Sequence, residues 1–270
     1  VITRSAKGTE SITKNPYHST GDITFNQLEA IWHDDTNDTN DLSTLETGNA
    51  NDLFIRATIT DADGDSESAD INLGLGVFSV NDDGPSIDDN AILAADTLNV
   101  DESDLTVDAT ANFADNFAPA FNYGADGAGN VAYSFGLSAA SVASGLYAVD
   151  NTDTSVDADG FGQGDEILLT QIGNVITGSA NGTDYFTITL DDTTGDITFN
   201  QLEAIWHDDT ADNDDLSTLN TQNAGDLQIV ATITDADGDS ASASIDLGQN
   251  VFSVNEIGRA SCRERVLDRV

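Results

Sequence analysis

Residues 227–247 read LQIVATITDADGDSASASIDL, and this stretch sets the fold class. Apolar and polar residues alternate on both sides of a central Asp-Gly pair, and the alternating apolar positions are Leu227, Ile229, Ala231, Ile233, Ala243, Ile245 and Leu247. Because successive side chains of a strand point to opposite faces, this period of two gives one buried face and one wet face. Asp-Gly is also a favoured hairpin dipeptide. The stretch therefore predicts an antiparallel β-hairpin.

Short strands of the same kind are expected along the rest of the second half of the chain. They fall at residues 131–135, 166–170, 186–190, 196–202 and 251–254. Short strands separated by Gly, Asp and Asn turns are typical of sandwiches. The helical spacing of Leu202, Ile205 and Trp206 predicts one or two helical turns at most. The predicted fold class is all-β, with antiparallel β-sandwich modules of Ig-like or cadherin-like type in tandem.

The chain repeats itself with a period of 174 residues. Residues 20–81 match residues 194–255 at 49 of 62 positions without a gap. Self-similarity at a fixed period is the sequence signature of tandem modules. Residues 1–83 are therefore interpreted as the C-terminal half of one repeat, and residues 84–255 as a complete repeat.

Both ends of the chain depart from this repeat. Residues 1–19 are expected to be divergent or damaged and poorly ordered, because Pro16 removes a ladder donor where residues 186–190 form an alternating strand. Residues 256–270 hold four arginines and the single cysteine, Cys262. We interpret this segment as a non-native read-through tail, with a short basic native tail as the alternative.

The composition is strongly acidic. The formal net charge at pH 7 is −41, and between residues 15 and 255 Arg56 is the one Lys or Arg side chain. Such a surface repels nucleic acid and anionic lipid, which excludes both as partners. An apolar run of about 18 residues is absent, so no membrane insertion is expected. The charge favours cations as ligands, and a solvated acidic surface is the simpler alternative.

The turn sequence DADGD occurs in both copies of the hairpin. Three carboxylates on alternate positions of one turn repel one another unless a cation lies among them. Oxygen ligands favour a hard divalent ion, which makes Ca²⁺ the predicted cofactor. The turn is not an EF-hand, since its glycine falls at the fourth place rather than the sixth, and plain turn chemistry is the alternative. The candidate ligands of the two turns are Asp61, Asp63, Asp65, Asp235, Asp237 and Asp239.

An acidic junction, VNDDGP, follows the last strand of the first repeat, and its glycine and proline end that strand. The segment VDESD, just inside the second repeat, is expected to supply partners from the other side of this junction. An ordinary polar linker is the alternative interpretation. The further candidate calcium ligands in these two segments are Asn81, Asp82, Asp83, Asp101, Glu102 and Asp104.

An acidic loop begins at His207, directly after the apolar Ala204-Ile205-Trp206. A His-Asp pair can belong to a catalytic triad or a zinc site. However, the sequence has no nucleophile motif and no HExxH, so neither a catalytic residue nor an enzymatic activity is predicted. Trp206 is expected in the core, with His207 at its solvent edge.

Four stretches occur together in this chain. They are VDESDL at 100–105, YGADGAGNVAYSFGLS at 123–138, DDTTGDITFNQLEAIWHDDT at 191–210 and ITDADGDSASASIDLGQNVFSVN at 233–255. Together they resemble the extender repeat of giant repeats-in-toxin (RTX) adhesins, which bacteria export by type I secretion. The resemblance runs over residues 20–255 and implies tandem β-sandwich modules, extracellular calcium and a place on the bacterial cell surface.

The resemblance implies a non-catalytic spacer that is rigidified by calcium and serves cell adhesion and biofilm formation. Its implied partners are neighbouring repeats of the same chain and the type I secretion machinery, and the module is expected to be monomeric. An acidic module of this kind is expected to fold where calcium neutralises its carboxylates. The alternative function is a ligand-binding module that recognises carbohydrate or another cell surface.

Overall fold

A computed structural model describes residues 2–5, 9–14, 21–35, 38–49, 51–153, 162–209 and 214–256. Within these ranges, side chains are described from residue 21 onward. Strands dominate the described residues, and their helical segments are one short α-helix and two 3-10 helices. The predicted all-β class is confirmed. In the described part of the chain, no helix has the length and apolar composition that a membrane span requires.

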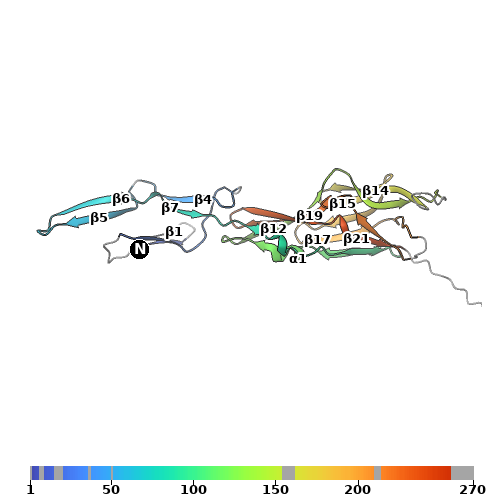
Figure 1. The fold of residues 1–270 in the computed structure, drawn as a ribbon, viewed down its shortest axis with the longest axis horizontal. Helices are drawn as coiled ribbons and strands as arrows, with labels where there is room; N and C mark the ends of the chain where they lie inside the picture. Colours follow the sequence, from blue (N-terminus) through green and yellow to red (C-terminus); the bar gives the residue numbers. More distant parts are fainter. Residues whose placement is uncertain are drawn as a thin grey trace, which may run out of the picture. The chain divides into compact units, whose positions relative to one another are not determined.

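The chain divides into two compact units, which are described separately. The first consists of Val1–Ser86, Asn122–Asn130 and Ile233–Ala241, so it contains two loops of the second repeat. Its strands pair antiparallel as β1-β2-β3, β4-β7 and β5-β6, the last a long hairpin (Figure 1). Their bounds are β1 Ile2–Ser5, β2 Thr9–Lys14, β3 Ile23–Gln27, β4 Leu42–Glu46, β5 Phe54–Thr60, β6 Ser66–Asn72 and β7 Leu75–Asn81.

The second unit consists of Ile87–Phe121, Val131–Thr232 and Ser242–Val270. Strands β12, β19 and β20 cross the boundary and also hold residues of the first unit. The main strands are β9 Leu98–Asp101, β10 Ala109–Asn112, β12 Ala128–Leu137, β13 Val142–Val149, β14 Gln163–Ile172, β15 Val175–Ala180, β16 Thr183–Leu190, β17 Asp196–Gln201, β18 Leu216–Asn220, β19 Leu227–Asp235, β20 Ser240–Asp246 and β21 Gln249–Asn255. The remaining elements are β8 Ser86–Ile87, β11 Phe121–Asn122, α1 Ala114–Phe117 and the 3-10 helices η1 Asp89–Ala91 and η2 Ala118–Ala120.

Packed sheets form the core of the second unit. One sheet has six antiparallel strands in the order β10-β17-β16-β15-β14-β13, and two three-stranded sheets have the orders β12-β19-β20 and β18-β21-β9. The pair β9 and β21 is parallel, a departure from the expected antiparallel pairing. Sheet-on-sheet packing of alternating apolar residues gives the sandwich its interior. Core residues from all three sheets include Leu98, Ile167, Leu169, Ile176, Ile188, Phe199, Leu227, Ile229 and Phe252.

The predicted hairpin is present as β19 and β20. Leu227, Ile229, Ala231 and Ile233 of β19 are fully buried, and the residues between them are partly exposed. On β20, Ile245 is buried as predicted. The alternation read from residues 227–247 therefore identified the buried face of this hairpin correctly.

Strands β15 to β21 repeat β1 to β7 at the 174-residue spacing. The strand expected to be lost near the N-terminus is present as β2, paired with both β1 and β3. Ile12 of β2 pairs with Phe25, as Ile188 of β16 pairs with Phe199. Relative to β16, the pairing of β2 is thus shifted by two residues. Pro16 lies outside the described residues.

The helical turns predicted from Leu202, Ile205 and Trp206 are wrong. The structure has irregular backbone there, in which Ile205 forms an isolated antiparallel bridge with Ala148. Ile205 is buried, whereas Leu202 is exposed. A short apolar spacing cannot distinguish a helical turn from a bridged loop, and here the strand β13 provides the bridge partner.

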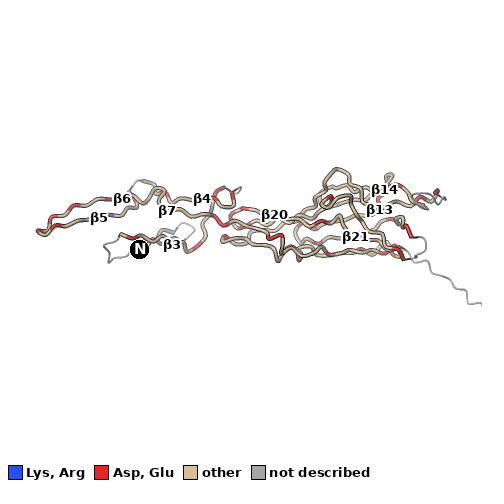
Figure 2. Tube along the Cα trace, in the orientation of Figure 1, with Lys and Arg blue, Asp and Glu red and all other residues tan. Residues whose placement is uncertain are grey.

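Acidic residues occupy many turns and strand ends of both units (Figure 2). Arg56 is the one Lys or Arg among the side chains that the structure describes, and it pairs with Asp70 through two hydrogen bonds of 2.7 Å. Described carboxylates other than Asp70 therefore depend on water, on N–H and O–H donors, or on cations from solution.

Candidate metal centre

The DADGD turn is closed by hydrogen bonds of its first aspartate. The Asp235 N–H donates to Asp239 O at 3.0 Å, and Asp235 Oδ1 accepts the N–H groups of Gly238 and Asp239 at 3.0 and 2.9 Å. The first copy repeats this pattern with Asp61 in place of Asp235. Gly238 has φ of +116°, a region that favours glycine. The first aspartate of each turn thus uses one oxygen to close the turn, and in the second copy the other oxygen, Asp235 Oδ2, has no hydrogen-bond partner in the described part of the chain.

In the second copy, two further aspartates join the turn. Asp82 of the acidic junction and Asp126 of the glycine-rich loop lie beside Asp237, with one oxygen of each within 4.8 Å of the others. Asp235, Asp237 and Asp239 form a second group by the same measure. These five residues, here called the aspartate cluster, all belong to the first compact unit.

Close backbone contacts bring Asp126 to the hairpin. Gly124 has φ of +70°, and a Cβ at this position would overlap the carbonyl of Asp83. Further along the loop, Gly127 O accepts the Ala236 N–H at 3.1 Å. Only glycine allows so close an approach of two backbones. The glycines around Asp126 therefore place its carboxylate in the cluster.

Several cluster oxygens are buried without a partner. Asp82, Asp235 and Asp239 are 6%, 3% and 2% exposed. A buried carboxylate without a counter-charge is strongly destabilising. Among the side chains that the structure describes, Arg56 is the one Lys or Arg and is already paired with Asp70, so no Lys or Arg side chain compensates these carboxylates. The buried cluster oxygens that lack a hydrogen-bond partner in the described part of the chain are Asp82 Oδ2, Asp235 Oδ2, Asp237 Oδ1 and Asp239 Oδ2.

Burial and crowding raise the pKa of three cluster aspartates. Burial, contact with the Asp82 carboxyl and the charge of Asp237 raise the pKa of Asp126 to about 6. Burial and the Asp82 carboxyl likewise raise the pKa of Asp239 to about 6, and burial raises the pKa of Asp235. Two carboxyl groups share a hydrogen bond only when one is protonated, so their facing oxygens repel once both are ionised. A divalent cation removes that repulsion.

The first copy of the turn remains open to solvent. Asp61, Asp63 and Asp65 also bring one oxygen each within 4.8 Å of the others, but all three are exposed. A hydrogen bond with Asp63, followed by backbone N–H groups, lowers the pKa of Asp61. Water and the turn itself satisfy this group, and exposed acidic groups of this kind are common without an ion.

The junction residues separate into two sets. Asp82 joins the cluster, whereas Asn81 and Asp83 are exposed and belong to neither group. Asp101 and Asp104 are exposed in the second unit, where they accept the N–H groups of the residues two positions further on. The expectation that the VDESD segment would supply ligands to the junction is therefore not met by the described residues.

Sequence reasoning missed Asp126. The sequence feature that could have identified this ligand is the Ala-Asp-Gly triplet at residues 125–127, which repeats the central three residues of DADGD. The glycine-rich stretch around it was interpreted as a simple turn. Nothing local in such a turn indicates that it packs against a hairpin more than 100 residues away.

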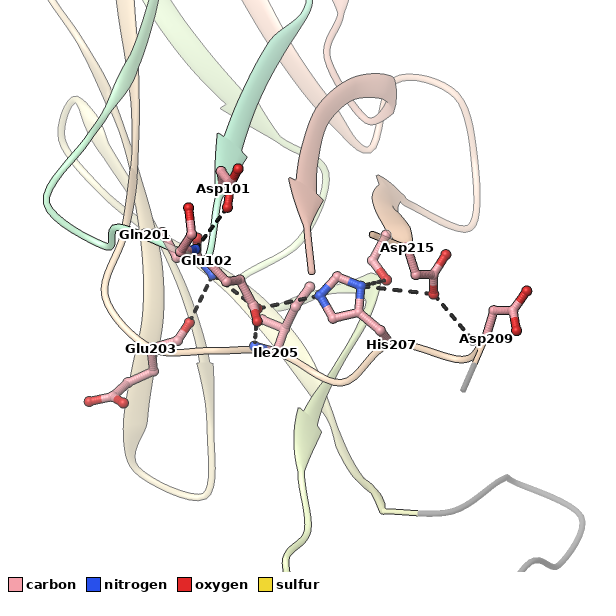
Figure 3. Close-up of polar contacts among 10 residues, drawn as sticks. Asp101, Glu102, Gln201, Glu203, Ile205, His207, Asp209 and Asp215 are labelled. Carbon is pink, nitrogen blue, oxygen red and sulfur yellow. Dashed lines mark hydrogen bonds and ion pairs between the residues drawn. The ribbon is translucent and has the colours of Figure 1, made fainter. Parts of the chain in front are cut away.

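Glu102, the remaining predicted ligand, is buried within the second unit instead. Its Oε1 accepts the Ile205 N–H at 2.7 Å and Gln201 Nε2 at 3.2 Å, and it lies 3.4 Å from His207 Nε2 (Figure 3). Gln201 Nε2 also donates to Glu203 O at 3.2 Å. Hydrogen-bond donors thus surround the Glu102 carboxylate, and a buried charged group needs such partners. Glu102 fixes the loop after β17 and has no place in the cluster.

His207 and Trp206 occupy the reverse of their predicted positions. The His207 side chain is 4% exposed, and its Nδ1 lies 3.1 Å from Ser217 Oγ. Trp206 is only partly buried and meets Tyr147 edge-on, with ring centroids 6.1 Å apart. The prediction of a core tryptophan and a solvent-edge histidine is wrong, because the imidazole lies beside the buried Glu102 carboxylate (Figure 3) and the partly buried Ser217 hydroxyl.

The chemistry of the aspartate cluster suits a hard cation. All five side chains offer carboxylate oxygens, and neither histidine nor cysteine side chains belong to the two ligand groups. Calcium takes six to eight oxygen ligands in flexible geometry, and backbone carbonyls and water complete such shells. Softer metals prefer sulfur and imidazole ligands, which these groups lack. The residues therefore fit calcium better than zinc or copper.

Comparison with known proteins links the chain to one family. A family model described as a domain of unknown function (DUF5801) matches residues 7–74 and 97–248, and the two matches end 174 residues apart, at equivalent positions of the repeats. No curated protein and no solved structure matches the chain. Because the matched ranges cover more than half of the 270 residues, the chain belongs to the DUF5801 family.

Proposed function

We propose that this chain is a non-catalytic spacer of a secreted bacterial surface adhesin, in which calcium fastens one repeat to the next. The aspartate cluster carries this proposal. Asp82 belongs to the first repeat in sequence, and the other four aspartates belong to the second. A cation bound by both sets joins segments that lie far apart in the sequence. One cysteine in the chain leaves no internal disulfide to do so.

Calcium binding makes the stability of the module depend on its surroundings. Extracellular calcium modules bind with dissociation constants of roughly 10⁻⁴–10⁻³ M. A single site at ten times its dissociation constant adds about 1.4 kcal/mol to the free energy of unfolding. Without the ion, the buried carboxylates repel one another and oppose folding. The module is thus stable outside the cell and weakened in a calcium-poor cytosol.

This behaviour fits export in the unfolded state. The tandem repeat and the resemblance to RTX extender repeats support type I secretion and a position on the bacterial surface. Neighbouring repeats of the same chain are then its main partners. The acidic surface supports the exclusion of nucleic acid and anionic membranes.

Thermal unfolding of the full chain tests the calcium requirement. The midpoint is measured in calcium chloride, in EGTA, and in sodium chloride of equal ionic strength. One occupied site predicts a rise of about 3–6 °C in calcium, at about 2–4 °C for each kcal/mol in a chain of this size. Sodium chloride is expected to give a smaller rise, because it only screens the charges. Equal midpoints in calcium and EGTA would overturn the calcium part of the proposal.

A second candidate function is carbohydrate binding in the second unit. A cavity of about 390 Å³ is lined there by residues that include Tyr147, Trp206, Asp208 and Asn220. Partly exposed aromatic rings next to carboxylate and amide groups suit a polar ligand with apolar faces. A glycan array with the full chain, repeated with Trp206→Ala, tests this role. Signal that disappears in the variant supports it, and a blank array excludes the sugars on the array.

A further inference from the structure

The aspartate cluster holds two ligand groups rather than one. Asp82 and Asp126 share a group with Asp237, whereas Asp235 and Asp239 share another group with the same Asp237. Oxygens bound to one calcium ion lie 2.3–2.6 Å from it and therefore at most about 5 Å from one another. Each group meets this limit, with one oxygen of every member within 4.8 Å of the others, and Asp237 is the member that the two groups share.

The unpaired oxygens are divided between both groups. Asp82 Oδ2 lies in the first, and Asp235 Oδ2 and Asp239 Oδ2 lie in the second, all buried and without a partner among the described residues. Asp237 belongs to both. Its Oδ2 accepts the His33 N–H at 3.3 Å, and its buried Oδ1 has no hydrogen-bond partner in the part of the chain described. Each group thus contains at least one residue with a buried oxygen that has no hydrogen-bond partner in the described part of the chain.

The charge of the cluster also favours more than one ion. Five ionised aspartates carry five negative charges, and one divalent cation leaves three of them uncompensated in a largely buried site. A second divalent cation leaves one. Because like charges a few ångströms apart repel strongly where water is scarce, a second cation offsets carboxylate repulsion that a single cation leaves.

We infer that the aspartate cluster binds two divalent cations, one in each group, with Asp237 as their shared ligand. This inference rests on the proposed calcium-dependent function and assigns the ions different roles. The cation held by Asp235 and Asp239 binds within one turn and orients Asp237. The cation held by Asp82 and Asp126 then connects the two repeats through that oriented side chain.

Calcium titration of the full chain by calorimetry at pH 7 tests the number of ions. Asp126→Asn changes only the first group, and so does Asp82→Asn apart from its contact with Asp239. Asp239→Asn changes only the second group, and Asp237→Asn changes both. Asp65→Asn is the matched control in the exposed turn. We expect the first three variants to lose one bound ion each, Asp237→Asn to lose two, and the control to lose none.

Each other outcome has a clear meaning. Loss of the same single ion in all four cluster variants would overturn the two-ion inference and leave the proposed function standing. A wild-type chain that binds no calcium with these residues would overturn the proposed function itself. Asparagine keeps the side-chain volume and removes a repelling charge, so the variants are expected to fold. Circular dichroism in EGTA checks this, and Asp82→Asn provides a second test of the first position if Asp126→Asn unfolds.

Discussion

The two DADGD turns have the same five residues and the same closing hydrogen bonds, yet their first carboxylates differ in burial and in the direction of their pKa shifts. Asp61 is exposed and its pKa is lowered, whereas Asp235 is buried and its pKa is raised. The difference arises from Asp82 and Asp126, which crowd the second turn and have no counterpart in the ligand group of the first. A metal site is therefore a property of what surrounds a turn, and the turn sequence alone does not create it.

The apolar residues of the two hairpins show the same contrast. Ile59 in β5 is 75% exposed, and its counterpart Ile233 in β19 is fully buried. In the described part of the chain β5 pairs only with β6, whereas β19 pairs with both β20 and β12. The apolar residues Ile59 and Ile233 thus occupy equivalent positions, but among the described residues only that of the second hairpin is covered.

The largest expected effect comes from this apolar face. Ile233→Ala removes a fully buried side chain and is expected to lower the free energy of unfolding by about 2–5 kcal/mol. Ile59→Ala is expected to change it by less than about 0.5 kcal/mol, because that side chain is already in water. Urea unfolding of both variants measures the difference. Equal losses would show that the first hairpin is covered in solution.

The next effect concerns calcium. In Asp239→Asn, the calcium-induced gain is expected to fall by at least about 1.4 kcal/mol, the contribution of one site at ten times its dissociation constant. Asp65→Asn, the same change in the exposed turn, is expected to leave the gain unaltered. Thermal melts with calcium and with EGTA measure the gain for each chain. A similar loss in both variants would place the functional site outside the aspartate cluster.

A smaller effect tests what the two turns have in common. Gly64 and Gly238 have φ of +104° and +116°, where a Cβ is disfavoured. Alanine at either position is expected to cost about 1–2 kcal/mol, because the backbone strain is local. Equal losses of unfolding free energy in urea titrations would show that the two turns have the same backbone strain. A much larger cost at Gly238 would mean that strain there also displaces the aspartate cluster.

The smallest effect is a pH dependence of the calcium-free chain. The pKa values of Asp126 and Asp239 are raised to about 6 in the folded chain, against about 3.9 for an ordinary aspartate. The folded state therefore holds protons that the unfolded state has released, so stability falls as pH rises from about 4 to about 6.

Melting temperatures in EGTA across this range measure the slope. The double variant Asp126→Asn with Asp239→Asn is the control, and its slope is expected to be flatter, because both titrating groups are removed. A wild-type slope equal to that of the double variant would contradict the raised pKa values of these two groups.

Much of the fold was predictable because it depends on neighbours in sequence. Alternation identified the buried face of β19, and Asp-Gly identified its turn. Errors arose where partners are remote. The loop at Ile205 was predicted as a helical turn because its bridge partner on β13 is invisible in a local pattern. His207 was placed at the solvent edge because its buried partner Glu102 lies about one hundred residues earlier.

The candidate site divides in the same way. The sequence by itself determined the repeat, the hairpin and the three carboxylates of each DADGD turn, since hydrogen bonds and side-chain alternation within a few residues specify them. Only the tertiary structure decided that Asp82 and Asp126 meet Asp237, while Asp101, Asp104 and Glu102 do not. Loop packing between distant segments makes that choice. Burial then converts an ordinary acidic turn into a group of carboxylates whose negative charge is costly.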